Sequence, residues 1–160
     1  MNLYIKQHVF SWGDKFSVMD ENGNEKYYVE GEIFTFGRKL HVYDNDSNEV
    51  AYIEQELFSF MPRYKIYLDG LYAAEIKKEF TFFVPEYTVT LAGGRRWDVG
   101  GDFFDHDYEV MQNGDTVVSI NKEWLTWGDS YALHIANSVD EKLALAVVLA
   151  IDCVLASSNN

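Results

Sequence analysis

The sequence contains little cysteine, which cross-links a chain, and little proline, which interrupts helices and strands. Of its 160 residues one is cysteine and two are proline. A lone thiol cannot form an internal disulfide, and this scarcity fits the reducing cytoplasm, the compartment that we expect. With so little proline and no shift in composition along the chain, we expect neither a linker nor a disordered tail. The length then predicts a single domain over residues 1–160.

Basic residues are also few. The chain has 13 Lys and Arg against 26 Asp and Glu, which gives a formal net charge of −13 at pH 7. This charge repels polyanions, and basic residues occur at most in pairs, so we expect no binding to nucleic acid. Residues 1–6 contain no basic segment followed by an apolar run, so we expect no signal peptide.

What the sequence does contain is an internal repeat. Six windows of nine residues align without gaps, and their starts lie 24, 24, 23, 21 and 23 residues apart. The windows are residues 8–16, 32–40, 56–64, 79–87, 100–108 and 123–131. The fifth position is always aromatic, namely Trp12, Phe36, Phe60, Phe83, Phe104 and Trp127. The ninth position is aromatic or a large apolar residue, so the chain repeats one supersecondary unit six times.

After each window, apolar and polar residues alternate, as around Leu40 and Val42. A period of two over four to six residues is typical of a half-buried strand. Turn-forming pairs follow, among them Asp69-Gly70 and Asn113-Gly114, which suit tight hairpins. A second strand leaves each turn and runs into the next window. We therefore predict about twelve antiparallel strands over residues 2–136.

The alternation ends before a segment of another kind. Ser138 and Glu141 match a capping box, which predicts a helix N-cap at Ser138. Residues 143–151 are apolar without interruption, and more apolar residues follow Asp152. An all-round apolar helix lies in a core or a membrane, and this run is shorter than the roughly 20 residues that span a bilayer. We predict a buried helix over residues 139–156 and no transmembrane segment.

The number of strands predicts how the helix is used. About twelve strands are too many for a comfortable open sheet, and a barrel of that size is too wide for strand side chains alone to fill. We therefore predict a mainly β fold, in which a closed antiparallel barrel surrounds the buried C-terminal helix. A two-sheet sandwich capped by the helix is the alternative. The repeat is too short for a propeller blade of about 40 residues.

The densest group of possible metal ligands falls within one repeat window. Its members are Asp102, Asp105, His106 and Asp107. The other windows have turn residues at these places, so a polar turn is the simpler interpretation. The alternative is a metal or catalytic site. The Asp-rich segments 20–24 and 44–48 begin like calcium loops but lack the glycine and glutamate that such loops require. We expect hairpin turns there and no bound metal.

Other candidates are weaker. Two basic pairs, Arg38 with Lys39 and Arg95 with Arg96, are candidates for binding an anionic head group, although a solvated turn is the simpler explanation of the second pair. Cys153 lies in the apolar helix, where a thiol is inert. Asp152 beside it needs a partner, and we expect it to reach the rim of the barrel or to pair with an arginine. The sequence has no nucleotide-binding loop and no serine elbow, so we expect no cofactor.

Four segments together resemble the LURP-one-related family, part of the wider group of proteins like the tubby C-terminal domain. They are FSWGDKF (10–16), KLHVYD (39–44), LFSFMPRY (57–64) and ALAVVLAIDCVL (144–155). The resemblance covers nearly the whole chain. It implies a twelve-stranded antiparallel barrel around a central helix, which phospholipid scramblases share. Tubby domains bind phosphoinositides through basic residues, which do not align onto this chain one by one. The calcium segment and membrane span of scramblases are not found in this sequence.

Three functional hypotheses follow. The first is a non-enzymatic binding or scaffold module, because the repeat serves packing and no catalytic spacing is found. The second is a peripheral membrane protein that binds anionic phospholipid or phosphoinositide head groups. The third is an enzyme that uses the cluster at residues 102–107. The expected partner is a phospholipid head group or a protein.

Overall fold

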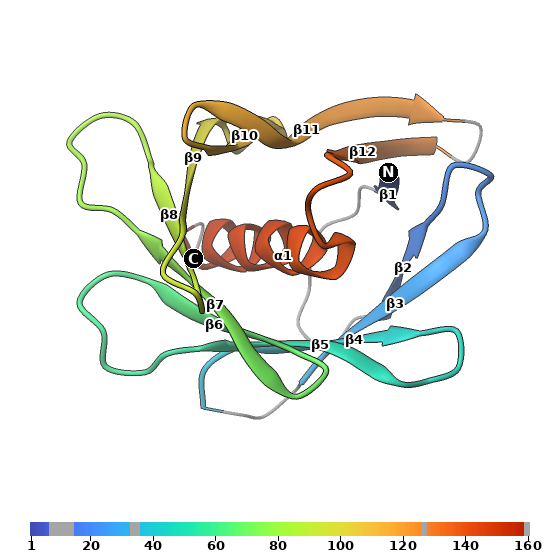
Figure 1. The fold of residues 1–160 in the computed structure, drawn as a ribbon, viewed down its shortest axis with the longest axis horizontal. Coiled ribbons are helices and arrows are strands. Elements are labelled where there is room, and N and C mark those ends of the chain that lie inside the picture. Colours follow the sequence, from blue (N-terminus) through green and yellow to red (C-terminus); the bar gives the residue numbers. More distant parts are fainter. Residues whose placement is uncertain (7–14, 33–35, 126–127, 159–160) are drawn as a thin grey trace.

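Twelve antiparallel strands close into one barrel around a single helix, within the part of the chain that the computed structural model describes (Figure 1). That part is residues 1–6, 15–32, 36–125 and 128–158. The strands are β1 (Asn2–Lys6), β2 (Lys15–Met19), β3 (Glu25–Gly31), β4 (Lys39–Asp44), β5 (Glu49–Gln55), β6 (Arg63–Leu68), β7 (Leu71–Lys78), β8 (Tyr87–Leu91), β9 (Arg96–Asp102), β10 (Asp107–Gln112), β11 (Asp115–Leu125) and β12 (Gly128–Ile135). Each strand pairs with the next, and β1 closes on β12. The predicted barrel is confirmed and the sandwich alternative is wrong.

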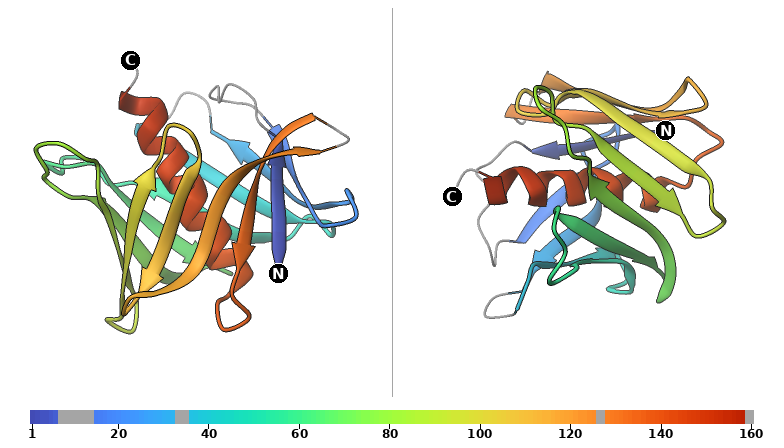
Figure 2. Two further views of the ribbon diagram at one scale, coloured as in Figure 1. Left: turned by 90° about the horizontal axis from the view of Figure 1, so that it is seen from above. Right: turned by 90° about the vertical axis from the view of Figure 1, so that its left-hand side faces the viewer.

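The topology gives the barrel two distinct ends. Because consecutive strands are antiparallel neighbours, the described connections that follow odd-numbered strands lie at one end, and those that follow even-numbered strands lie at the other. We call the first end the mouth and the second the far end. Helix α1 (Glu141–Ser158) starts at the far end and finishes at the mouth. In the left view of Figure 2 the C-terminus is at the top and the connection from β12 to α1 is at the bottom.

Turn chemistry shapes the far end. Asp69 and Gly70 have φ values of 48° and 82°, and Asn113 and Gly114 have 53° and 86°, as the predicted tight hairpins require. The two segments that begin like calcium loops are also turns. Oδ1 of Asp44 accepts the backbone N–H groups of Asp46 and Asn48, each at 2.9 Å, and Asp20 does the same in its own turn. These backbone hydrogen bonds hold the pKa of both carboxyls below its usual value.

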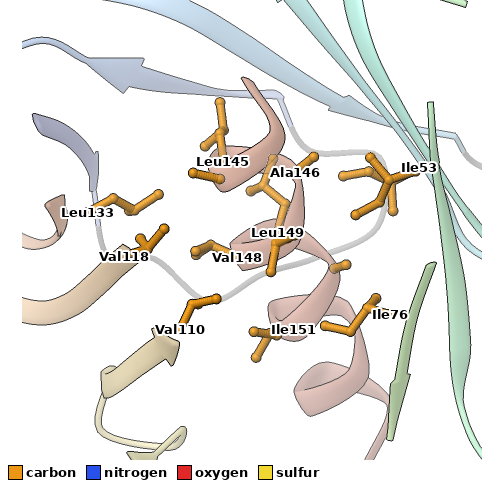
Figure 3. Close-up of a cluster of buried hydrophobic side chains, with 14 of the residues drawn as sticks. Ile53, Ile76, Val110, Val118, Leu133, Leu145, Ala146, Val148, Leu149 and Ile151 are labelled. Atoms are coloured by element: carbon orange, nitrogen blue, oxygen red, sulfur yellow. The ribbon is translucent and has the colours of Figure 1, made fainter. Parts of the chain in front are cut away.

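The core is the inner face of the barrel packed on the helix. Figure 3 shows Leu145, Val148 and Ile151 among side chains from strands on different sides of the barrel, including Ile53, Ile76, Val110, Val118 and Leu133. Residues 144–151 of α1 are all buried to within 1%. The helix is therefore apolar on every side because every side meets a strand. Within the described residues, no helix is long and apolar enough to cross a membrane.

The start of the helix differs from the prediction. Oδ1 of Asp140 accepts the N–H groups of Lys142 at 2.8 Å and Leu143 at 3.0 Å, which makes Asp140 the N-cap. The capping box at Ser138 was therefore wrong. Glu141 turns instead to the barrel wall, where its carboxylate accepts from Tyr27 and pairs with Lys26. These contacts fix the depth at which the helix enters the barrel.

Candidate functional site

The ninth positions of the repeat line the inside of the barrel near its mouth. Each begins or nearly begins an even-numbered strand, and Tyr64, Tyr87, Tyr108 and Tyr131 are all at most 5% exposed. The ring of Phe103, from the β9–β10 connection, packs edge-on against Tyr87 and tilted against Tyr108. A layer of tyrosines therefore surrounds the C-terminal part of α1.

Asp152, the one acidic residue in the apolar stretch of the helix, reaches this layer. Its Oδ2 accepts a hydrogen bond from the Tyr131 hydroxyl, and its Oδ1 lies 3.4 Å from Nε2 of His106. The His106 ring stacks on Tyr131 with centroids 4.2 Å apart. A left-handed backbone at His106, with φ of 51°, turns this side chain inward from the β9–β10 connection. Asp152 therefore reaches the mouth, which was one of the two predicted outcomes, and its contacts there are to a tyrosine and a histidine.

The Asp152 carboxyl affects the pKa of the ionisable side chains around it. Burial together with the nearby Asp152 raises the pKa of Tyr108 and Tyr131 well above the usual value for tyrosine. Burial also raises the pKa of the Cys153 thiol, which keeps it protonated and unreactive. The Tyr108 hydroxyl and Nδ1 of His106 are buried with no hydrogen-bond partner among the described residues. Asp152, His106 and the tyrosines therefore form a cluster of largely buried side chains just beneath the mouth.

The four candidate metal ligands are dispersed by the turn that carries them. Asp102 accepts the backbone N–H of Asp105 at 3.1 Å, which shapes the turn. Asp105 is exposed and pairs with Lys122 at 3.1 Å, while Asp107 is exposed at the start of β10. His106 points inward to Asp152. Across the described part of the chain, no group of three His, Cys, Asp or Glu side chains is arranged to hold a metal ion.

The two basic pairs lie at opposite ends of the barrel. Arg38 and Lys39 are at the mouth, where Arg38 donates to the Cys153 carbonyl at 2.8 Å and so caps the last turns of α1. Lys39 lies 3.9 Å from Glu32. Arg95 and Arg96 are at the far end, and Arg96 pairs with Asp98 at 2.9 Å. The structure does not bring the two pairs together into one anion site.

Large apolar side chains project from the mouth into solvent. Four connections carry them, and together we call these residues the aromatic rim: Phe36, Leu57, Phe58, Phe60, Phe80, Phe82, Phe83, Val84 and Phe104. The rings of Phe36, Phe58, Phe60 and Phe83 are 90% or more exposed. The other exposed large apolar residues of the described chain, Met1, Leu71 and Tyr72, lie at the far end. Exposed apolar surface is thus concentrated at one end of the barrel.

The rim also contains backbone strain and a hollow. Phe58 has a φ of 64°, a conformation that a bulky residue adopts at a cost, and its ring gains no contact in return. Between the β7–β8 and β9–β10 connections is an open pocket of about 410 Å³. Its lining residues are Phe83, Val84, Pro85, Gly101, Asp102, Phe103 and Phe104. The mouth therefore joins exposed rings to an apolar recess above the tyrosine layer.

Sequence reasoning found the repeated aromatics but missed their exposure. Phe36, Phe60, Phe83 and Phe104 hold the fifth position of their windows, between the strands of each pair. The signal was the turn residue close by, such as Gly37, Pro62 or Pro85, which places the fifth position on a connection instead of a strand. Trp12 and Trp127, the two remaining fifth-position residues, lie outside the described residues.

Comparison with known proteins agrees with this architecture. The family model described as LURP-one-related matches residues 1–152. A Bacillus subtilis (strain 168) protein named "Uncharacterized protein YxjI" is 34% identical over 155 residues, covering 97% of this chain and 94% of that protein. A solved structure from Arabidopsis thaliana superposes with a TM-score of 0.73 at 16% identity, over 96% of this chain and 90% of the other. That last likeness concerns the fold alone.

Proposed function

This chain belongs to the LURP-one-related family, and from that premise we propose that it is a non-enzymatic binding module that engages its partner through the aromatic rim. The family supplies the barrel, and a fold alone does not supply a function. The proposal therefore depends on the side chains at the mouth.

One observation carries the proposal: nine large apolar residues from four separate connections are exposed at the same end of the barrel. Exposed apolar side chains scattered singly need no explanation, but a concentration of them marks an interaction surface. The strained, fully exposed Phe58 supports this view, because neither its backbone nor its ring contributes to folding.

The packing beneath the rim supports a role in binding instead of catalysis. His106 and Asp152 would be the natural acid–base pair, yet their side chains are 17% and 12% exposed. The Tyr131 ring covers one face of His106, and the Tyr131 hydroxyl occupies one oxygen of Asp152. A substrate would have to displace these contacts before it reached either group.

The test compares the full chain with a rim variant, Phe60→Ser with Phe83→Ser, and with Leu71→Ser as the matched control. Leu71 is 75% exposed at the far end, so it controls for the loss of an exposed apolar side chain. Thermal-shift and titration screens against nucleotides, peptides and lipids would identify ligands, and hydrolase substrates would be tested in parallel. We expect no turnover, and weaker binding of any ligand by the rim variant only.

Two results would contradict this proposal. Turnover that is lost in His106→Ala would make the protein an enzyme that uses the buried pair. A ligand that binds the rim variant and the unchanged chain equally would place the binding surface elsewhere.

A further inference from the structure

We propose that the aromatic rim docks the barrel end-on onto the surface of an electrically neutral, zwitterionic phospholipid bilayer. This inference rests on the proposed function, because it names the partner of the same surface. It follows from the shape of the rim, from the pairing of charges around it, and from the concentration of exposed apolar side chains at one end of the barrel.

The shape of the rim suits a soft partner. The rings of Phe36, Phe58, Phe60 and Phe83 are at least 90% exposed, so each projects beyond its own connection and touches little of the protein. A protein partner would need a separate pocket for each projecting ring, since protein interfaces are packed as closely as interiors. The headgroup and acyl boundary of a bilayer accepts such rings without a matching shape, and aromatic side chains concentrate there.

Basic side chains at the mouth lie in ion pairs with acidic neighbours. Lys39 pairs with Glu32 at 3.9 Å, Arg63 with Glu56 at 3.7 Å and with Glu75 at 3.5 Å, Lys77 with Glu79 at 3.7 Å, and Lys122 with Asp105 at 3.1 Å. These pairs neutralise the basic side chains, and Glu86 and Asp107 add acidic groups at the same end, so the mouth has no excess of positive charge. A surface of this kind complements a neutral lipid interface and lacks the net positive charge that would attract anionic head groups.

Acidic residues lie at both ends of the barrel, and Glu56, Glu79 and Glu86 are on connections at the mouth. The far end carries Asp20 and Glu21, Asp44 and Asp46, Asp69, Asp115 and Asp140 in its turns and at the start of α1. With the rim on a bilayer, these carboxylates face water on the opposite side of the barrel. Exposed apolar side chains, and not charge, therefore distinguish the two ends, and their concentration at the mouth defines a single docking orientation.

The experiment is co-sedimentation of the full chain with two kinds of vesicle, phosphatidylcholine alone and phosphatidylcholine mixed with phosphatidylserine. The test variant is Phe58→Ser, Phe60→Ser, Phe83→Ser, and Leu71→Ser is the matched control. We expect the full chain and Leu71→Ser to bind phosphatidylcholine vesicles at low and high salt alike, because apolar contacts are not screened. The triple variant should bind at least roughly tenfold more weakly, because transfer of a single ring into an apolar phase has about that effect.

Phosphatidylserine should weaken binding or leave it unchanged, because the chain carries a net charge of −13. Circular dichroism of each variant checks folding, and Phe58→Ser alone replaces the triple variant if that one unfolds. Analytical ultracentrifugation without vesicles shows whether the rim instead joins two copies.

Three results would overturn the inference, and they separate it from the proposed function. Rim-dependent self-association without vesicle binding would leave the rim as the binding surface and make a second copy its occupant. Binding that requires phosphatidylserine, disappears at high salt and survives the triple substitution would contradict both proposals. Failure of the full chain to bind either vesicle ends the bilayer inference and leaves the proposed function standing, because that result says nothing of other ligands of the rim.

Discussion

At the scale of single residues, positions that look equivalent in the sequence have different structural roles. Gly100 and Gly101 are adjacent in β9, but a Cβ at Gly100 would meet nothing within 4 Å, whereas one at Gly101 would meet the opposite strand. The ladder between β9 and β10 is regular here, so Gly101 serves a close approach of two strands.

Gly101→Ala should destabilise the barrel strongly. Gly101 has a φ of 137°, and an added Cβ would lie 2.6 Å from Cα of Tyr108 and 2.7 Å from the carbonyl oxygen of Asp107. Backbone strain and overpacking together should lower the free energy of unfolding by about 2–4 kcal/mol. Urea unfolding measures this, with Gly100→Ala as the control. Equal midpoints for the two variants would contradict the close approach.

Phe58→Asn should raise stability and lower binding at the same time. The left-handed backbone at Phe58 suits asparagine better than phenylalanine, and the exposed ring contributes no packing. We expect a gain of about 0.5–1 kcal/mol in the free energy of unfolding, measured by thermal melting. Vesicle binding should fall in the same variant. A loss of stability would show that the Phe58 ring supports the fold.

His41, on the outer face of β4, should make stability depend on pH. Burial by itself would lower its pKa, but hydrogen bonds to Glu32 at 2.6 Å and Glu49 at 2.7 Å outweigh burial and raise it. Because the pKa of His41 is higher in the folded protein than in the unfolded chain, its protonation stabilises the fold most fully at pH values below the unfolded pKa. This contribution is lost as the pH rises through the folded pKa. Stability should therefore fall by about 1 kcal/mol or less between about pH 6 and pH 8, since solvent screens the pair.

His41→Gln is the control for that pH profile. The variant cannot gain a proton, so its melting temperature should change less over the same pH range. An unchanged slope would assign the pH dependence to another group.

At the scale of elements, the helix and the barrel depend on one another. Strand side chains face inward around α1, and the register shifts of four hairpins recur at matching places in the repeat, at Val18/Met19, Val42/Tyr43, Ile66/Tyr67 and Val110/Met111. Such shifts bend and twist a sheet, which helps it to close. A sheet built to close around a helix has no other core.

Removal of the helix should therefore unfold the barrel. A chain of residues 1–137 would leave the inward side chains around a void, and each fully buried leucine of α1 is worth about 1.5–3 kcal/mol. Leu145 and Leu149 are both 0–1% exposed, and domains have only about 5–15 kcal/mol of stability in all. We expect an insoluble or non-cooperative product by circular dichroism. A cooperative melt close to that of the full chain would show that the helix is not the core.

A single charge in the helix should act almost as strongly. Val148 is fully buried in the middle of α1, so Val148→Asp would place a carboxylate among apolar side chains without a partner. We expect a loss of several kcal/mol, about 3–5, in urea unfolding. Val148→Ala is the matched control and should lose less, because it removes packing without adding charge. Similar losses in both would contradict burial at this position.

At the scale of the whole molecule, closure leaves none of the twelve described strands with a free edge. Cys153 is inside, 0% exposed, and burial raises the pKa of its thiol. A thiol reagent should therefore label the native protein only when the barrel opens. The labelling rate should follow the free energy of unfolding as urea is added. Rapid labelling in native buffer, with a weak dependence on urea, would indicate a local opening at the mouth.

Much of the fold was predictable because its signals are local. A period of two in the strands, Asp-Gly and Asn-Gly in the turns and an all-round apolar run near the C-terminus each belong to a few consecutive residues. The helix N-cap was predicted at Ser138 but lies at Asp140, because serine and aspartate are both favoured at that position. The wall residues Lys26 and Tyr27 decide where Glu141 points.

The sequence by itself thus determined the twelve strands, their hairpin turns and the buried helix. Tertiary structure alone decided what gathers at the mouth. Tyr131 and Asp152 are 21 residues apart, and Arg38 and Cys153 are 115 apart, and they meet only because the barrel closes around the helix. The exposure of the aromatic rim has the same origin. Closure aligns connections distant in sequence at one end, where no further element of the described chain covers them.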